Sequence, residues 1–107
     1  MRFIELMLVN VRSYKKQKIV FPAGIVLLAG DIGSGKSTIL LAIEFALFGI
    51  VRGVIRPSSL LRNGAQTCLV ELVFEVGNKV YTVRRVLKRT NNIIEQESGY
   101  LILGLHQ

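Results

Sequence analysis

Gly30-Asp31-Ile32-Gly33-Ser34-Gly35-Lys36-Ser37 is the most informative stretch of this chain, because it matches the pattern G-x-x-x-x-G-K-[ST] without a mismatch. An apolar run at 25–29 precedes the motif and a helix-forming run at 37–48 follows it. Glycines in such a turn let backbone N–H groups point at phosphate oxygens, and the helix N-terminus adds partial positive charge. The pattern predicts a phosphate-binding P-loop. The alternative is a glycine-rich turn between strand and helix that holds no ligand.

Two side chains of the motif have expected chemical roles. Lys36 would reach the β- and γ-phosphates of a nucleotide, and the Ser37 hydroxyl would be a ligand of the Mg²⁺ that bridges them. The expected ligands are therefore ATP and Mg²⁺. Elsewhere, no spacing of His, Cys or carboxylates suggests a zinc or iron site. Cys68 stands on the apolar side of an expected strand, which favours a small core residue over a nucleophile.

The rest of the chain predicts an α/β fold. The expected elements are strands at 2–11, 19–21 and 25–29, a helix at 37–48 that ends at Gly49, a loop at 50–66, a hairpin of 67–76 and 79–88, and a strand at 93–97. We therefore expect a P-loop NTPase half-domain, with a mixed sheet, one buried helix after the P-loop and an antiparallel β-lobe. The P-loop subdomain would span 1–66 and the β-lobe 67–107.

Length and composition restrict the class of protein. The 107 residues suffice for one small core but are few for a complete P-loop ATPase, and 50% of them are hydrophobic, so the chain is expected to be part of a larger assembly. No apolar run is long enough to span a membrane, and the most apolar stretch, 39–51, contains Glu44. The first residues lack the pattern of a signal peptide, and there is one cysteine. We expect a cytoplasmic chain with no membrane contact.

The charge of the chain favours a polyanionic partner. The formal net charge is +7, and the densest basic cluster lies in the expected hairpin. Its members are Lys79, Arg84, Arg85, Lys88 and Arg89. Strand alternation would place Lys79, Arg85 and Arg89 on one face of the sheet and the other two on the opposite face. This cluster predicts non-specific contact with DNA phosphates, and the alternative is an ordinary solvated strand.

The residues around the motif resemble a known family. Three blocks carry the likeness: Asn10-Val11-Arg12-Ser13-Tyr14, the P-loop with the helix 38–49, and the strand pair 71–75 and 81–85. In this order they resemble the N-terminal half of an ABC-type ATPase head. More narrowly, they are similar to the SbcC-like double-strand-break repair ATPases of the structural-maintenance-of-chromosomes (SMC) superfamily. The likeness covers about residues 1–97.

This resemblance implies a larger set of nucleotide-binding residues. Arg12 and Ser13 match positions that approach the nucleotide from the end of the first strand. Thr38 matches a residue beside the α-phosphate, and 63–64 matches a backbone stretch near the adenine. The implied set is Arg12, Ser13, Gly30, Asp31, Ile32, Gly33, Ser34, Gly35, Lys36, Ser37, Thr38, Asn63 and Gly64. Ile32 departs from the asparagine common in the family, and Arg12 could instead be a surface charge at the end of a strand.

The acids that hydrolysis requires are missing from this sequence. A P-loop ATPase needs one carboxylate to hold Mg²⁺ and another to orient water, whereas the one Asp here, Asp31, lies inside the P-loop. The late apolar run 101–103 ends in Gly104 instead of an acid. In the family the acid strand, the signature motif and the glutamine loop lie downstream. We therefore assign no catalytic residue and expect hydrolysis only with a C-terminal half.

The resemblance also implies partners. They are the C-terminal half of the head, a second head in a dimer that holds ATP between the two, a metal-dependent nuclease, and DNA. Two alternatives stay open at this point. The chain could be a non-catalytic binding or regulatory fragment, or a fragment of an ABC transporter ATPase.

Overall fold

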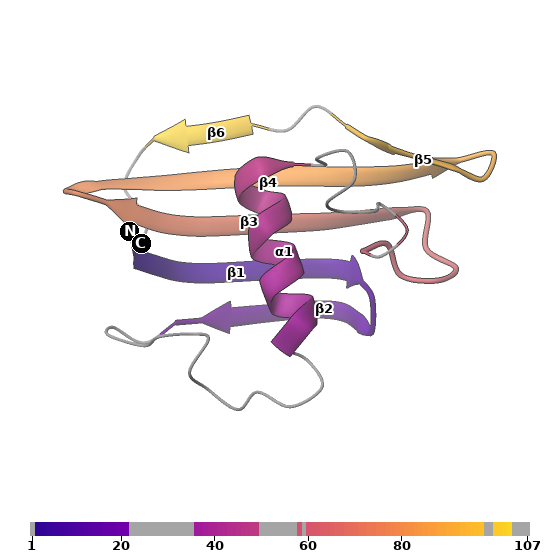
Figure 1. Cartoon of the computed structure of the whole chain (residues 1–107), viewed down its shortest axis with the longest axis horizontal. Helices are drawn as coiled ribbons and strands as arrows, with labels where there is room; N and C mark the ends of the chain where they lie inside the picture. Colours follow the sequence, from indigo (N-terminus) through magenta and orange to yellow (C-terminus); the bar gives the residue numbers. More distant parts are fainter. Residues whose placement is uncertain (1, 22–35, 50–57, 59, 98–99, 104–107) are drawn as a thin grey trace.

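The structure, a computed structural model, describes residues 2–21, 36–49, 58, 60–97 and 100–103 (Figure 1). The elements of this part are β1 (Arg2–Val11), β2 (Tyr14–Val20), α1 (Lys36–Phe48), β3 (Thr67–Val76), β4 (Lys79–Thr90), β5 (Ile93–Gln96) and β6 (Tyr100–Leu103). They form two layers, in which α1 lies across one face of a single sheet (Figure 1). The P-loop residues 30–35 and the expected strand 25–29 lie outside the described residues.

The sheet joins strands from distant parts of the sequence. Its order is β2-β1-β3-β4-β5, and β6 pairs with the other half of the β4 edge that β5 occupies (Figure 1). Every pairing among the described strands is antiparallel. The mixed character of the expected sheet depended on strand 25–29. The place of that strand in the sheet therefore stays a prediction.

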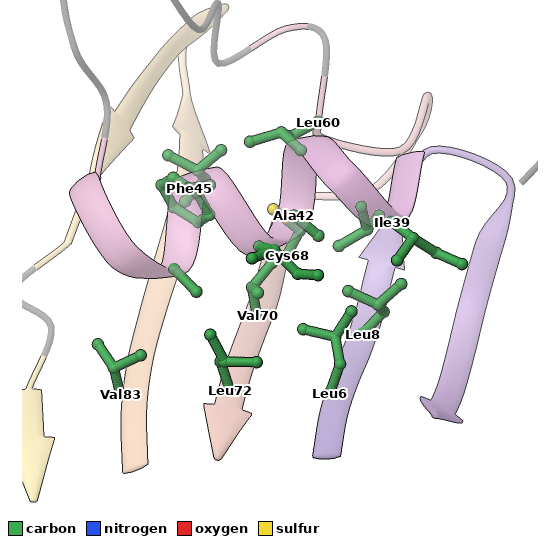
Figure 2. Packing of buried hydrophobic residues seen from close by; sticks show 14 of the residues in the cluster. Leu6, Leu8, Ile39, Ala42, Phe45, Leu60, Cys68, Val70, Leu72 and Val83 are labelled. Atoms are coloured by element: carbon green, nitrogen blue, oxygen red, sulfur yellow. The ribbon is translucent and has the colours of Figure 1, made fainter. Parts of the chain in front are cut away.

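Side-chain alternation gives the sheet one apolar face for the helix. Leu6 of β1 stands opposite Leu72 of β3, and Leu72 stands opposite Val83 of β4, so the three form a row across the sheet. All three are buried under α1 (Figure 2). Because successive strand residues point to opposite faces, their neighbours Glu71 and Arg84 face away from the helix. The predicted alternation in the hairpin is confirmed.

The helix buries its apolar side chains on this face. Ile39, Ala42 and Phe45 point from α1 toward the sheet, where they join one core with the apolar strand residues (Figure 2). On the opposite side Glu44 is exposed, and at the end of the helix Phe48 is 66% exposed. The predicted helix is confirmed, and most of its length contributes to the core.

Two strands differ from the sequence-based expectation. We expected a second strand at 19–21, but β2 begins at Tyr14 and includes the polar run 15–18. This run forms a strand because it pairs with β1 along an edge of the described sheet, where exposed lysines are tolerated. We expected no particular element after residue 97, but this segment contains β6, whose Leu101 pairs with Val83. Both strands are defined by their partners more than by their own composition.

Candidate functional site

Helix α1 begins where the P-loop motif requires it to begin. Its first residue is Lys36, and its first turn lies over the β1–β2 side of the sheet (Figure 1). This end carries the free N–H groups and the partial positive charge that attract a phosphate. The motif residues 30–35 and the side chains of Lys36 and Ser37 lie outside the described part. Thr38 is described, and it is buried with 4% of its surface exposed.

The predicted residues Arg12 and Ser13 form the turn between β1 and β2. Val11 pairs with Tyr14, so the turn has two residues. Arg12 has a φ of 52°, a left-handed value that residues other than glycine rarely adopt. Its N–H donates a hydrogen bond of 2.8 Å to the Leu60 carbonyl. A backbone contact from a distant part of the chain therefore stabilises this turn.

The predicted pair Asn63 and Gly64 lies in a second turn. The Ala65 N–H donates to the Arg62 carbonyl at 3.0 Å, which closes the turn around the pair. Gly64 has a φ of 86°, as the third residue of a type II turn requires, and this value favours glycine. Asn63 and Gly64 are both exposed, so this turn is accessible to a ligand.

The structure brings these two turns together. The Arg62 N–H donates to the Asn10 carbonyl at 3.0 Å, and the Arg62 Nη1 donates to the Arg12 carbonyl at 3.0 Å. Leu60 and Leu61 are buried in the core that α1 also enters, and Leu60 lies beside the helix in Figure 2. The two turns thus share a corner that is fixed to both the sheet and the helix.

The titratable groups near this core do not form a second site. Within the described residues, no group of three His, Cys, Asp or Glu side chains could hold a metal ion. Burial raises the pKa of the Cys68 thiol from its ordinary 9.0 to about 11, and a backbone hydrogen bond at Leu87 lowers it in part. A thiol with so high a pKa is a poor nucleophile at neutral pH.

The described part of the chain also has no helix that is long and apolar enough to cross a membrane.

The basic cluster of the hairpin separates into residues with different environments. Arg84 forms an ion pair with Glu71, at 2.7 Å between Nη2 and Oε2, and the Arg85 Nε donates to the Ala46 carbonyl at 2.8 Å. Lys88 is exposed at the far end of β4. Next to it, Arg89 has a buried Nε with no hydrogen-bond partner in the described structure. The five cations therefore do not form one free surface.

Comparison with known proteins identifies the family. The sequence profile described as "AAA domain" matches residues 5–102. The chain belongs to the AAA domain family. This AAA domain chain is 34% identical over 97 residues to the DNA double-strand break repair Rad50 ATPase of Thermoplasma acidophilum, and 41% identical over 76 residues to that of Methanococcus maripaludis. These matches cover 91% and 71% of the AAA domain chain but only 11% and 8% of the relatives.

Solved structures agree on the fold. Two structures of the recombination mediator protein RecF, one of them with ATP, superimpose on this AAA domain chain with TM-scores of 0.66 and 0.60. Each match covers 94% of the chain and 26% of RecF at 22% identity. The expected α/β half-domain of a P-loop NTPase is confirmed. The resemblance to the N-terminal part of a double-strand-break repair ATPase of the SMC superfamily is also confirmed.

Two arginine contacts in this AAA domain chain, one in the corner and one at the C-terminal end of α1, were not expected from the sequence. Arg62 links the two turns, and Arg85 contacts the end of the helix. Arg85 was expected on the same face as Lys79 and Arg89, and this is what the register shows. The contacts themselves depend on which segments meet in space, and no local sequence pattern indicates that.

Proposed function

We propose that this chain is the nucleotide-binding N-terminal half of a double-strand-break repair ATPase head. The observation that carries the proposal is that α1 begins at Lys36, so that the last two residues of a complete P-loop motif form the start of the helix. The N-terminus of that helix would bind the phosphates, with Lys36 on the β- and γ-phosphates and Ser37 on Mg²⁺. The relatives that are named Rad50 ATPases support this reading over a transporter.

The corner of the two turns would complete the nucleotide site. Arg12 and Ser13 are suited to donate to phosphate oxygens, and the exposed backbone of Asn63 and Gly64 is suited to an adenine edge. Thr38 would lie beside the α-phosphate. The hydrogen bonds that tie the two turns support this assignment, because they fix one set of predicted residues relative to the other.

ATP binding is tested by calorimetric titration of the protein with ATP and Mg²⁺. Lys36→Ala removes a charged donor, so we expect binding to weaken by about 1.5–3 kcal/mol. Lys16→Ala, a change of an exposed lysine on β2, is the matched control and should leave the affinity unchanged. Equal ATP affinities for the parent and Lys36→Ala would contradict the assignment.

Hydrolysis would require groups that the 107 residues do not contain. We propose that a C-terminal half supplies the two carboxylates, and that a second head closes over the ATP. A metal-dependent nuclease would join this assembly in the cytoplasm. Phosphate release by the 107-residue chain alone should stay at background. If this chain releases phosphate above background and Lys36→Ala abolishes the release, the proposal that a C-terminal half supplies the carboxylates is wrong. A regulatory fragment would bind ATP without hydrolysis even when a C-terminal half is added.

DNA contact is proposed for the end of the hairpin. Arg84 and Arg85 are engaged within the fold, which leaves an exposed Lys88 and a half-buried Arg89 near one end of β4, on opposite faces of the strand. Two phosphate contacts would give a slope of about −1.8 for log K against log salt. Anisotropy of a labelled duplex should show a flatter slope for Lys88→Ala/Arg89→Ala than for the control Lys79→Ala. Coincident slopes for the parent and the double variant would leave the hairpin without a DNA role.

A further inference from the structure

The C-terminal end of α1 has no cation of its own. None of the residues in its last turn is basic, although cations stabilise the negative end of a helix dipole. Gly49, with a φ of 72°, ends the helix, and its N–H donates to the Phe45 carbonyl at 2.7 Å. The next carbonyl, that of Ala46, lies in the last turn, whose carbonyl groups have no partner within the helix and accept from a donor outside it.

Arg85 of β4 is that donor. Its Nε donates to the Ala46 carbonyl at 2.8 Å, and the side chain is half-buried. Arg85 points toward the helix because it pairs with Val70, and Val83 and Leu87 on the same face of β4 are buried and apolar. A guanidinium in an apolar row is costly unless it is hydrogen-bonded. The hydrogen bond to the Ala46 carbonyl therefore offsets part of the cost of placing Arg85 among these apolar side chains.

The Arg85 guanidinium lies so close to the end of α1 that only a glycine fits at position 49 without a shift of neighbouring side chains. A Cβ at Gly49 would lie 3.0 Å from the Arg85 Nη1 and 3.0 Å from the Gln96 Oε1. The Arg85 guanidinium and the Gln96 side chain of β5 therefore both lie close to Gly49 at the end of α1. A side chain at Gly49 would have to displace one of these two groups.

We propose that Arg85 is a positioning residue for the nucleotide site, and this inference rests on the proposed function. A helix of 13 residues is a rigid rod about 20 Å long, so the position of one end restricts the other. Arg85 ties the C-terminal end of α1 to β4, while the N-terminal end carries Lys36 and Ser37. A helix released at Ala46 would place these two residues less accurately, and small misplacements lower the effectiveness of a binding site.

The test compares Arg85→Met with Arg84→Met in the 107-residue protein. Both variants remove one arginine charge from β4, but Arg84 lies on the opposite face of the sheet and contacts Glu71. Two readouts are needed: ATP affinity by calorimetry on fully folded protein, and hydrogen exchange of the α1 amides by mass spectrometry. Leu87→Val is a second control, because it perturbs the helix-facing side of β4 without touching the Ala46 carbonyl.

We expect Arg85→Met to weaken ATP binding by roughly ten-fold or more and to speed exchange in both ends of α1. Arg84→Met and Leu87→Val should keep the parent affinity. Arg85→Lys, which retains a charged donor, should recover part of the loss and tests the proposal if Arg85→Met does not fold. Equal effects of Arg85→Met and Leu87→Val on ATP affinity would overturn the proposal, since they would indicate a role in stability alone.

The two readouts separate this inference from the proposed function. If the parent protein binds no ATP, the proposed function fails, and the exchange data still show whether Arg85 holds the helix. If the parent binds ATP but the hydrogen-bonded amides that follow the first turn of α1 exchange equally fast in Arg85→Met and Arg84→Met, the positioning role fails and the nucleotide site stands.

Discussion

The buried thiol of Cys68 gives a measurable pH dependence of stability. Its side chain is 1% exposed, beneath α1 and Leu60, and burial raises its pKa from 9.0 to about 11 (Figure 2). The folded state resists ionisation that the unfolded chain undergoes freely, so this contribution is complete below pH 9 and is lost as the pH rises toward 11. From these two pKa values, proton linkage lowers the free energy of unfolding by about 1.3 kcal/mol between pH 8 and pH 10.

Urea unfolding of the parent and of Cys68→Val at these two pH values isolates the effect. Valine keeps the site apolar and removes the titration, so the ionisation of lysines and tyrosines, and any pH-independent effect of its larger side chain, cancel in the comparison. We expect the free energy of unfolding of the parent to fall by about 1.3 kcal/mol more than that of the variant. If the free energy of unfolding falls equally in the parent and in Cys68→Val, the thiol is hydrated, and the packing of α1 and Leu60 over Cys68 is refuted.

Two further predictions concern the helix end and the sheet. Gly49→Ala should lower the free energy of unfolding by more than the 1–2 kcal/mol expected for a left-handed residue, because the new Cβ also displaces Arg85. Gly77 has a similar φ of 62° but open space around it, so Gly77→Ala is the control. If Gly49→Ala and Gly77→Ala lower the free energy of unfolding in urea equally, the contact with Arg85 adds nothing and the prediction is wrong. A double-mutant cycle of Arg84→Met and Glu71→Gln should give a coupling of about 0.5 kcal/mol that weakens in salt. A coupling that about 1 M NaCl leaves unchanged would show a pair shielded from solvent.

Local patterns predicted the elements that depend on local chemistry. The hairpin of β3 and β4 follows from period-2 alternation on both sides of Gly77, and the helix follows from its apolar residues and the glycine stop at Gly49. The P-loop motif predicted where α1 begins. These features are confirmed because no distant residue is needed to define them.

Features that depend on distant partners were missed or shortened. The polar run at 15–18 becomes a strand only because β1 offers an edge, and β6 forms only because β4 has room beside β5. The tie between Arg62 and the Arg12 turn joins segments 50 positions apart. Of the predicted site, Arg12 and Ser13 meet Asn63 and Gly64 through this tie. The contacts of all the predicted site residues with a nucleotide stay predictions.

The pairing of β1 with β3 has a consequence for the order of folding. Leu6 pairs with Leu72, so the P-loop motif and α1 lie inside one long chain segment that this pairing closes. The β3–β4 hairpin closes over a two-residue turn and can form early, whereas closing the long segment costs more chain entropy and is slower. We expect the phosphate-binding turn to become competent only in the last folding step. Nucleotide in a refolding experiment would then slow unfolding and leave the folding rate unchanged.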